Sequence, residues 1–309
     1  MRAIQQFTFG GPEVLRLVDL PEPAGQPGRV RVRVAAVGVN PADVAARAGW
    51  LAGRMPDLAL PFTVGSDLAG TVLDGDGPFA PGTRVAALSP WFVTREGTYA
   101  EIVSVDPAWL AEIPADVDDV TAAAVPLVAE TGIEALDQVD LRAGQTVLIT
   151  GASGAVGSFA VQGAVRRGAE VVAVGSAHDE QYLATLGAKV VIPRPATTEA
   201  LVSAVRERYP DGVDTVVDPA GAAASIGAVR DGGIFGSVVA LAMPGAERGI
   251  DVRHVQAFSD GTLLARVLGD IADGSMTVRI GLTLPFDQVA EAHARVQDCS
   301  VRGKIVLTW

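Results

Sequence analysis

Three closely spaced glycines near the middle of the chain are the residues whose spacing most clearly indicates chemistry. An apolar segment at residues 147–150 runs directly into Gly151, Gly154 and Gly157, and a helix-like stretch follows. The first glycine suits a tight turn, the second lets backbone approach a diphosphate, and the third lets the helix pack on the strand. A helix N-terminus also offers free N–H groups and a partial positive charge. The spacing therefore predicts a dinucleotide-binding turn made of Gly151, Ser153, Gly154, Ala155, Val156 and Gly157.

The next apolar segment, at residues 171–174, completes a βαβ unit around this turn, which supports dinucleotide binding. The alternative interpretation is a glycine-rich turn of an α/β protein that holds no nucleotide. An NAD site usually has an acidic residue about 20 positions after the glycines, where this chain has Ser176. No carboxylate there would repel a 2′-phosphate, so NADP(H) is favoured over NAD(H), although Asp179 and Glu180 are close in sequence. Arg194 is the candidate partner of that phosphate; its alternative role is a solvated loop cation.

The elements around the turn are those of an α/β domain. Apolar strands are predicted at 147–150, 171–174, 189–192, 215–218 and 234–241, separated by helix-length segments. This arrangement indicates a parallel sheet covered on both faces. Residues 1 to about 115 are instead typical of a β-rich unit, with alternating charged and apolar residues at 29–37 and further strands at 68–73, 84–88 and 99–103. The tail predicts helices at 261–272 and 287–296 and a last strand at 304–308.

Several segments outside the glycine turn form a pattern when they are taken in chain order. Residues 38–44 (GVNPADV), 60–70 (LPFTVGSDLAG), 82–85 (GTRV) and 97–103 (GTYAEIV) precede the turn, and residues 302–308 (RGKIVLT) close the chain. With these motifs the sequence resembles the medium-chain dehydrogenase/reductase superfamily, in its zinc-free, zeta-crystallin-like quinone oxidoreductase family.

This resemblance implies an α/β fold in which a GroES-like, β-rich catalytic domain carries an inserted Rossmann domain with a doubly wound parallel sheet. The catalytic domain would comprise residues 1–118 and 258–309, and the Rossmann NADP-binding domain residues 119–257. Nicotinamide and substrate would meet in a cleft between the two domains. The resemblance also implies a homodimer, commonly built by joining edge strands of two Rossmann sheets, and residues 252–258 are the candidate edge.

Three polar side chains are candidates for contacts with the cofactor, and the first two also for catalysis. The amide of Asn40 could hold ribose, nicotinamide or substrate, or else bond its own backbone in the turn before Pro41. The resemblance places Thr131 beside the nicotinamide, whereas an ordinary helical Thr bonds a preceding carbonyl. Lys304 either approaches the cofactor or is only a charged strand end. Asp43 is expected to cap the helix that starts there.

The remaining candidates would face the nicotinamide ring and the acceptor. Residues 240–243, which include Ala240 and Leu241, are expected to back the ring. A substrate pocket is predicted from Trp50, Leu51, Phe62 and Trp91, unless these large side chains belong to the core. Thr63 and Tyr99 are weaker candidates, because each could simply pack the first domain. If the prediction holds, an apolar or aromatic acceptor is preferred over a sugar.

Composition and residue counts exclude several classes of protein. The formal net charge of −12 opposes binding to nucleic acid or to anionic lipid. The uncharged stretch at 143–165 contains five glycines and is interpreted as strand, turn and helix, so no membrane association is expected. The lone Cys299 favours a reducing compartment, and with no secretory signal visible we predict a cytoplasmic location. Zinc requires Cys, His or carboxylate ligands, yet the only histidines are His178, His254 and His293, so no metal site is predicted.

These observations together predict an NADPH-dependent, zinc-independent oxidoreductase that transfers hydride to a quinone or an α,β-unsaturated carbonyl. An enoyl-thioester reductase is the nearest enzymatic alternative, because such reductases resemble the same family. A non-catalytic NADPH-binding protein is the alternative from another class, since no clear catalytic acid or base stands out in the sequence. A zinc alcohol dehydrogenase is a distant third.

Overall fold

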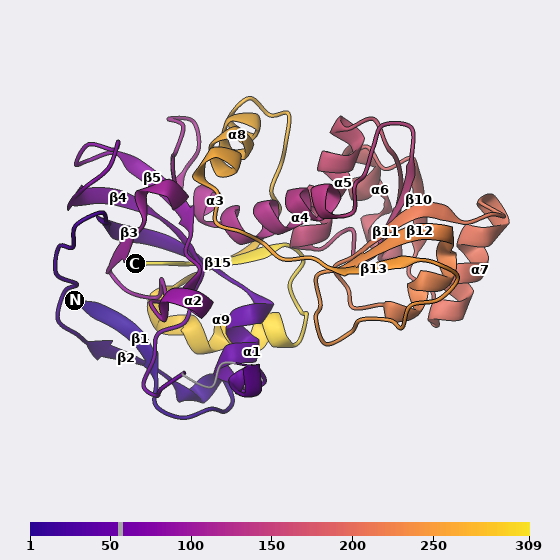
Figure 1. Cartoon of the computed structure of the whole chain (residues 1–309). Coiled ribbons are helices and arrows are strands. Elements are labelled where there is room, and N and C mark those ends of the chain that lie inside the picture. The colour runs from indigo at the N-terminus through magenta and orange to yellow at the C-terminus, as the bar shows by residue number, and fades with distance from the viewer. Residues whose placement is uncertain (55–57) are drawn as a thin grey trace. The chain divides into compact units, whose positions relative to one another are not determined.

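The structure, a computed structural model, describes residues 1–54 and 58–309. The chain forms two compact units (Figure 1). Unit 1 comprises Met1–Leu127 and Phe258–Trp309, and unit 2 comprises Val128–Ala257. Helix α4 (Pro126–Gln138) carries the chain from the first unit into the second. The two ends of the chain share unit 1 because strand β15 (Lys304–Thr308) pairs with β3 (Val30–Val39).

Unit 1 is built on a seven-stranded sheet of order β14-β15-β3-β4-β5-β7, with β6 also paired to β3. A separate antiparallel pair joins β1 to β2. The remaining strands are β1 (Arg2–Gln6), β2 (Leu15–Asp19), β4 (Asp67–Gly75), β5 (Arg84–Leu88), β6 (Ile102–Val105), β7 (Leu110–Glu112) and β14 (Ile280–Pro285). Its helices are α1 (Pro41–Arg47), α2 (Trp91–Thr94), α3 (Asp119–Ala123), α8 (Gly261–Ala272) and α9 (Val289–Gln297).

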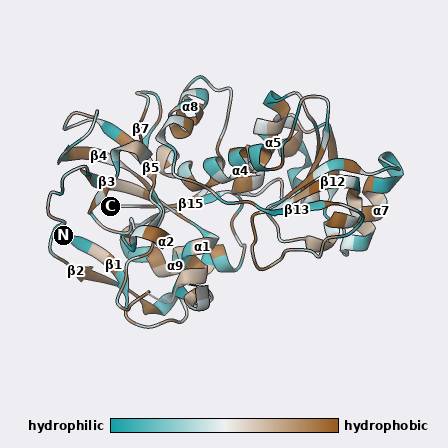
Figure 2. Cartoon of the chain, viewed as in Figure 1, coloured by the Kyte–Doolittle hydropathy of each residue, from teal (hydrophilic) through white to brown (hydrophobic). Residues whose placement is uncertain are grey.

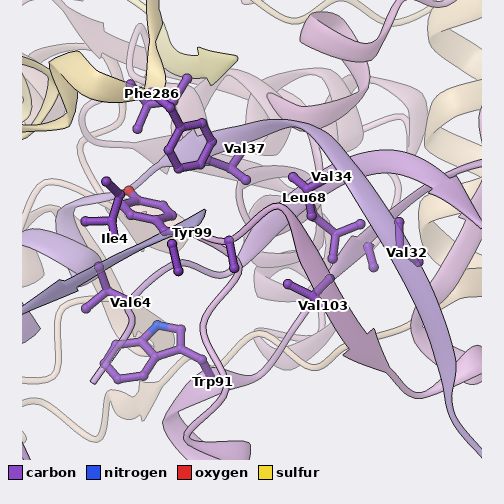
Figure 3. Close-up of a cluster of buried hydrophobic side chains, with 14 of the residues drawn as sticks. Ile4, Val32, Val34, Val37, Val64, Leu68, Trp91, Tyr99, Val103 and Phe286 are labelled. Atoms are coloured by element: carbon purple, nitrogen blue, oxygen red, sulfur yellow. The ribbon is translucent and has the colours of Figure 1, made fainter. Parts of the chain in front are cut away.

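Strand β3 shows how the sequence pattern becomes structure. Its first half alternates buried valines with the less buried Arg31 and Arg33, as the charged and apolar alternation predicts. Residues 36–39 are all buried, and the strand continues to Val39, beyond the predicted end at 37, where β15 pairs with it. The core of unit 1 lies beside it, and Figure 3 shows Tyr99 edge-on to Phe286, with ring centroids 6.0 Å apart.

Unit 2 is a six-stranded sheet of order β10-β9-β8-β11-β12-β13, and every pair in it is parallel. The predicted parallel sheet is thus confirmed, and its strand order reverses next to β8, which is the arrangement of a doubly wound dinucleotide fold. The strands are β8 (Thr146–Ile149), β9 (Glu170–Gly175), β10 (Val190–Pro193), β11 (Val213–Asp218), β12 (Val229–Ser237) and β13 (Asp251–His254). The helices are α5 (Ala155–Arg166), α6 (Glu180–Thr185) and α7 (Thr198–Arg208).

Three strand predictions need correction. Strand β12 ends at Ser237 and not at 241, because the Ser237 hydroxyl accepts the N–H of Val239 at 3.1 Å and the chain leaves the sheet. Strand β6 begins at Ile102 and not at 99, since the Tyr99 N–H donates across to the Val64 carbonyl. The edge strand β13 covers only residues 251–254 of the region expected up to 258, and it is largely polar (Figure 2).

No helix in the described ranges, 1–54 and 58–309, has both the length and the apolar character needed to cross a membrane.

Candidate functional site

The glycine turn of unit 2 joins the end of β8 to the start of α5. Gly151 has a φ of +53°, a left-handed conformation that glycine adopts without strain. A Cβ at position 157 would lie 2.3 Å from the Gly151 carbonyl oxygen. The first turn of α5 can therefore pack against Gly151 only if residue 157 is a glycine. A Cβ at position 154 would meet only that same oxygen, at 3.1 Å. The space beyond Gly154 is therefore open to a ligand.

This turn fits the diphosphate of a dinucleotide. Gly154 is the N-cap of α5, and because it is a glycine it has no side chain that could accept hydrogen bonds from the first N–H groups of the helix. Those groups, which begin with Ala155 and Val156, have no intrahelical acceptor and suit an anion. The Ser153 hydroxyl is only 3.4 Å from where a Cβ on Gly175 would be, so Ser153 lies beside the end of β9. The predicted turn residues thus lie together at the carboxyl ends of β8 and β9.

The two residues proposed to select the dinucleotide are also neighbours. Pro193 pairs with Gly175 across β10 and β9, and the Arg194 N–H donates to the Gly175 carbonyl at 2.7 Å. Ser176 follows Gly175 directly, and its hydroxyl accepts the N–H of His178 at 3.3 Å. Arg194 is exposed and, within the part of the chain that the structure describes, forms no ion pair. The backbone of Arg194 thus lies beside Gly175, the residue that directly precedes Ser176.

Three further residues that were predicted to contact the cofactor belong to unit 2. Thr131 is almost fully buried in α4. The next residue, Gly132, approaches α5 so closely that a Cβ there would lie 2.7 Å from the Val156 carbonyl oxygen. Ala240 and Leu241 lie in the loop after β12, and the Leu241 side chain is 70% exposed. The sequence prediction placed these two residues at a strand end, whereas the structure places them in a loop.

In unit 1, Asn40 and Lys304 belong to one buried polar cluster. The Lys304 ammonium donates to Asp67 Oδ2 at 2.8 Å and to the side-chain oxygen of Asn40. The Asn40 amide nitrogen donates to the same Asp67 oxygen at 2.9 Å, and the other Asp67 oxygen accepts the Leu127 N–H at 2.7 Å. Both polar atoms of the Asn40 side chain are therefore engaged within unit 1. Asp67 was not among the predicted residues, although an acid at the start of a buried strand is a signal that could have identified it.

A second group of buried side chains lies next to this cluster. Asp43 is the third residue of α1 and not its cap, and its carboxylate accepts the backbone N–H of the N-cap, Asn40, at 2.9 Å. The Tyr99 hydroxyl lies 3.4 Å from Asp43 and 3.3 Å from Nε2 of His293. Burial, reinforced by the charge of Asp67, raises the pKa of Asp43 to about 7. Burial also lowers the pKa of His293 to about 3 and raises that of Tyr99 well above its usual value.

The residues that were predicted to line the substrate pocket lie in three different environments in the structure. Trp91 is fully buried in the core (Figure 3). Its ring stacks on that of Phe62, with ring centroids 5.9 Å apart, so its assignment to the pocket is corrected. The helical turn at Trp91–Thr94 turns the ring inward, which the loop composition did not reveal. Phe62 and Thr63 line a pocket of about 440 Å³ within unit 1. Trp50 is 64% exposed and is not among the residues that line this pocket.

Among the residues in 1–54 and 58–309, no three His, Cys, Asp or Glu side chains lie together in a way that could hold a metal ion. The polar groups that the structure brings together are instead hydrogen-bonded to one another. In unit 1 these groups are an ammonium, an amide and a phenol.

Comparison with known families matches both ends of the chain. Residues 26–115 match the alcohol dehydrogenase GroES-like domain, and residues 186–307 match the zinc-binding dehydrogenase family. These two matches fall on the β-rich first part of the chain and on the stretch from the dinucleotide sheet to the last strand. They come in the order that the motifs predict.

Individual relatives agree with these matches. A quinone oxidoreductase of Rattus norvegicus is 39% identical over 59% of this chain, although the matched stretch spans only 55% of the rat protein's own length. A chloroplastic NADPH-dependent alkenal/one oxidoreductase of Arabidopsis thaliana is 29% identical over 99% of this chain and 79% of its own. The structure of a quinone oxidoreductase from Coxiella burnetii, 26% identical, covers 100% of this chain and 99% of its own with a TM-score of 0.89. The chain therefore belongs to the quinone oxidoreductase family of the medium-chain dehydrogenases/reductases.

Proposed function

We propose that this chain is an NADPH-dependent oxidoreductase that passes hydride to a quinone or an α,β-unsaturated carbonyl without a metal. The observation that carries the proposal is the open, side-chain-free turn from Gly151 to Gly157 at the N-terminus of α5. The names of the rat and Arabidopsis relatives support the acceptor class. NADPH is favoured over NADH because Ser176 leaves room for a 2′-phosphate and Arg194 offers it a cation.

The reduced nicotinamide, when bound, supplies the hydride, and the protein has to hold it, shield it from water and stabilise charge on the acceptor. In this proposal the glycine turn holds the diphosphate, while Thr131, Ala240 and Leu241 contact the ring. Reduction of an enone builds negative charge on the carbonyl oxygen, which requires a donor such as a hydroxyl or a backbone N–H. The buried Lys304–Asp67–Asn40 cluster fixes the start of α1 and the start of β15, and in this proposal it supports the acceptor side of the site.

Zinc independence is proposed from the ligands that the chain offers. Catalytic zinc sites use three protein ligands drawn from Cys, His and carboxylates. The only cysteine is Cys299, and the three histidines lie at 178, 254 and 293, outside the segments that precede the glycine turn. Metal analysis of the purified protein should therefore find no stoichiometric zinc.

The test of the reaction is NADPH oxidation against a panel of acceptors. We expect turnover of 1,4-quinones and small enones to exceed turnover of crotonyl thioesters. Activity with thioesters alone would favour an enoyl-thioester reductase and contradict the proposal. NADPH binding without turnover of any acceptor would favour a non-catalytic NADPH-binding protein.

We also propose a homodimer and a cytoplasmic location. Strand β13 is the edge of the unit 2 sheet, and an edge offers backbone groups for pairing with a second copy. Sedimentation should show twice the chain mass, and substitution of Val252 by Pro, which removes one edge N–H, should shift the protein toward monomer. The lone Cys299 suits a reducing compartment, which fractionation of cells that express the protein would check.

A further inference from the structure

Asp218, the last residue of β11, is a fully buried carboxylate that the sequence analysis did not single out. Its Oδ1 accepts the hydroxyl of Thr150 and, at 3.0 Å, the N–H of Ala222. Its backbone oxygen and its Oδ2 lie 3.3 and 3.5 Å from the Ser237 hydroxyl, which donates to them. Within the part of the chain that the structure describes, Asp218 has no ion-pair partner.

The partners of Asp218 come from the ends of three neighbouring strands, β8, β11 and β12. Thr150 follows β8 and directly precedes Gly151, the first residue of the glycine turn. Ala222 lies in the loop after β11. Ser237 ends β12, and its hydroxyl oxygen also accepts the N–H of Val239, the residue before Ala240. One side chain therefore connects the diphosphate turn to the loop proposed to contact the nicotinamide.

Contacts around Gly151 strengthen this connection. The Ala220 N–H lies 3.4 Å from the Thr150 hydroxyl oxygen, and a Cβ on Gly151 would come within 3.2 Å of the Ala220 side chain. The Thr150 N–H also donates to the Val217 carbonyl at 3.1 Å. The loop after β11 thus lies against the glycine turn, and Asp218 fixes both.

A buried carboxylate is costly unless its oxygens are hydrogen-bonded, and an apolar side chain would pack such a strand end at a lower cost. We propose that Asp218 is a positioning residue, which holds the 150–157 turn and the loop at 238–241 in the geometry that binds the dinucleotide. This inference rests on the proposed function, because it assumes that the turn binds NADPH. Asp218 itself acts through Thr150 and Ser237.

Strand β11 supplies a matched control at its other end. Asp214 accepts hydrogen bonds from the Thr146 N–H at 2.8 Å and from the Arg230 guanidinium at 2.9 Å. It therefore connects the same two strands as Asp218, β8 and β11, but at their opposite ends. A residue that serves only to hold the sheet together should matter equally at both ends. A residue that positions the dinucleotide turn should matter for NADPH binding at Asp218 alone.

The experiment is a titration of each variant with NADPH, together with its melting temperature. We expect Asp218→Ala to weaken NADPH binding about ten- to hundredfold, by analogy with the loss of a residue that orients a metal ligand. Asp218→Asn keeps an acceptor for Thr150 and Ala222 and should bind as the unchanged protein does. Asp214→Ala should lower the melting temperature without changing NADPH affinity. Thr150→Val, which removes only the hydroxyl, should weaken binding in the same direction and decides the matter if Asp218→Ala does not fold.

Unchanged NADPH affinity in a folded Asp218→Ala or Thr150→Val variant would overturn this inference alone. Equal weakening by Asp214→Ala would overturn it too, because the effect would then follow sheet stability. Failure of Asp218→Asn to keep the affinity would also contradict it, since charge and not hydrogen-bond geometry would be responsible. Absence of NADPH binding to the unchanged protein would instead contradict the proposed function, and this inference with it.

Discussion

The Lys304 ammonium and the Asp67 carboxylate form an ion pair of 2.8 Å with both side chains buried. Lys304 begins β15 and Asp67 begins β4, and strand β3 lies between them in the sheet. The pair passes over Gly38 of β3, where a Cβ would lie 2.4 Å from Asp67 Oδ2 and 2.6 Å from the Lys304 side chain. A glycine in the middle strand thus makes room for an ion pair between its two neighbours.

The first prediction concerns this ion pair. Removal of one partner leaves the other as an unpaired buried charge, so Lys304→Met should lower the free energy of unfolding by about 3–5 kcal/mol. The double variant Lys304→Met with Asp67→Asn should recover part of that loss, because the remaining side chain is neutral and still accepts the Leu127 N–H. Chemical denaturation of the three proteins measures both effects. A double variant less stable than Lys304→Met would contradict this explanation.

The second prediction is a pH dependence that arises from Asp43. Its pKa, raised by burial from 3.8 to about 7, means that the folded protein keeps a proton that the unfolded chain loses in this range. The contribution of Asp43 to stability therefore falls as pH rises from about 4 to about 7. At 1.36 kcal/mol per pKa unit, the change is roughly 4 kcal/mol. The free energy of unfolding of the unchanged protein, minus that of Asp43→Asn, should fall across this window, and a constant difference would contradict the prediction.

His293 should show the opposite sign. Burial lowers its pKa from 6.5 to about 3, so the unfolded chain takes up a proton that the folded protein refuses. Its contribution to stability is therefore lost as pH falls from about 6.5 to about 3. Relative to His293→Gln, the unchanged protein should become less stable on acidification, as denaturation at several pH values would show. An equal pH profile for the two proteins would mean that His293 titrates normally.

The third prediction concerns the packing of the glycine turn. Gly157→Ala places a Cβ 2.3 Å from the Gly151 carbonyl oxygen and 2.7 Å from the Ala152 Cα, so the start of α5 must move. We expect a loss of about 1–3 kcal/mol in stability, typical of overpacking, together with weaker NADPH binding. Gly269→Ala in α8 is the control, since a Cβ there meets nothing within 4 Å and should stabilise the helix by up to about 1 kcal/mol. Unchanged NADPH affinity in Gly157→Ala would argue against the turn as the binding site.

The fourth prediction concerns the choice of dinucleotide. If Arg194 binds the 2′-phosphate, Arg194→Ser removes a charge-assisted hydrogen bond of about 1.5–3 kcal/mol. Affinity for NADPH should fall by roughly ten- to hundredfold at that energy, while affinity for NADH should not change. Arg208→Ser, at an exposed residue that ends α7, is the charge-matched control. An equal fall for both dinucleotides would contradict a role specific to the 2′-phosphate.

The sequence predicts the parallel sheet and the glycine turn well because their signals are local. Apolar runs such as residues 171–174 and the spacing from Gly151 to Gly157 are enough to indicate a strand, a turn and a helix. The adjacency of Ser176 and Arg194 follows in turn from the pairing of consecutive parallel strands. The end of β12 could not be predicted, since the Ser237 hydroxyl that ends the strand bonds locally within an otherwise apolar run.

The buried clusters of unit 1 could not be predicted for a different reason. Lys304 and Asp67 are 237 positions apart, and only the pairing of β15 and β4 on either side of β3 brings them together. Residue type alone also cannot distinguish a pocket aromatic from a core aromatic. Trp91 is in the core because the short helix α2 turns it inward, whereas Trp50 remains exposed after α1.

The central claim is that the 151–157 turn binds a nicotinamide dinucleotide, and calorimetric titration of the unchanged protein tests it most directly. We expect saturable binding of one NADPH per chain, tighter than NADH and weakened in Gly157→Ala. If neither NADPH nor NADH produced binding heat with the folded protein, and neither raised its melting temperature, the 151–157 turn would not be a nicotinamide dinucleotide site.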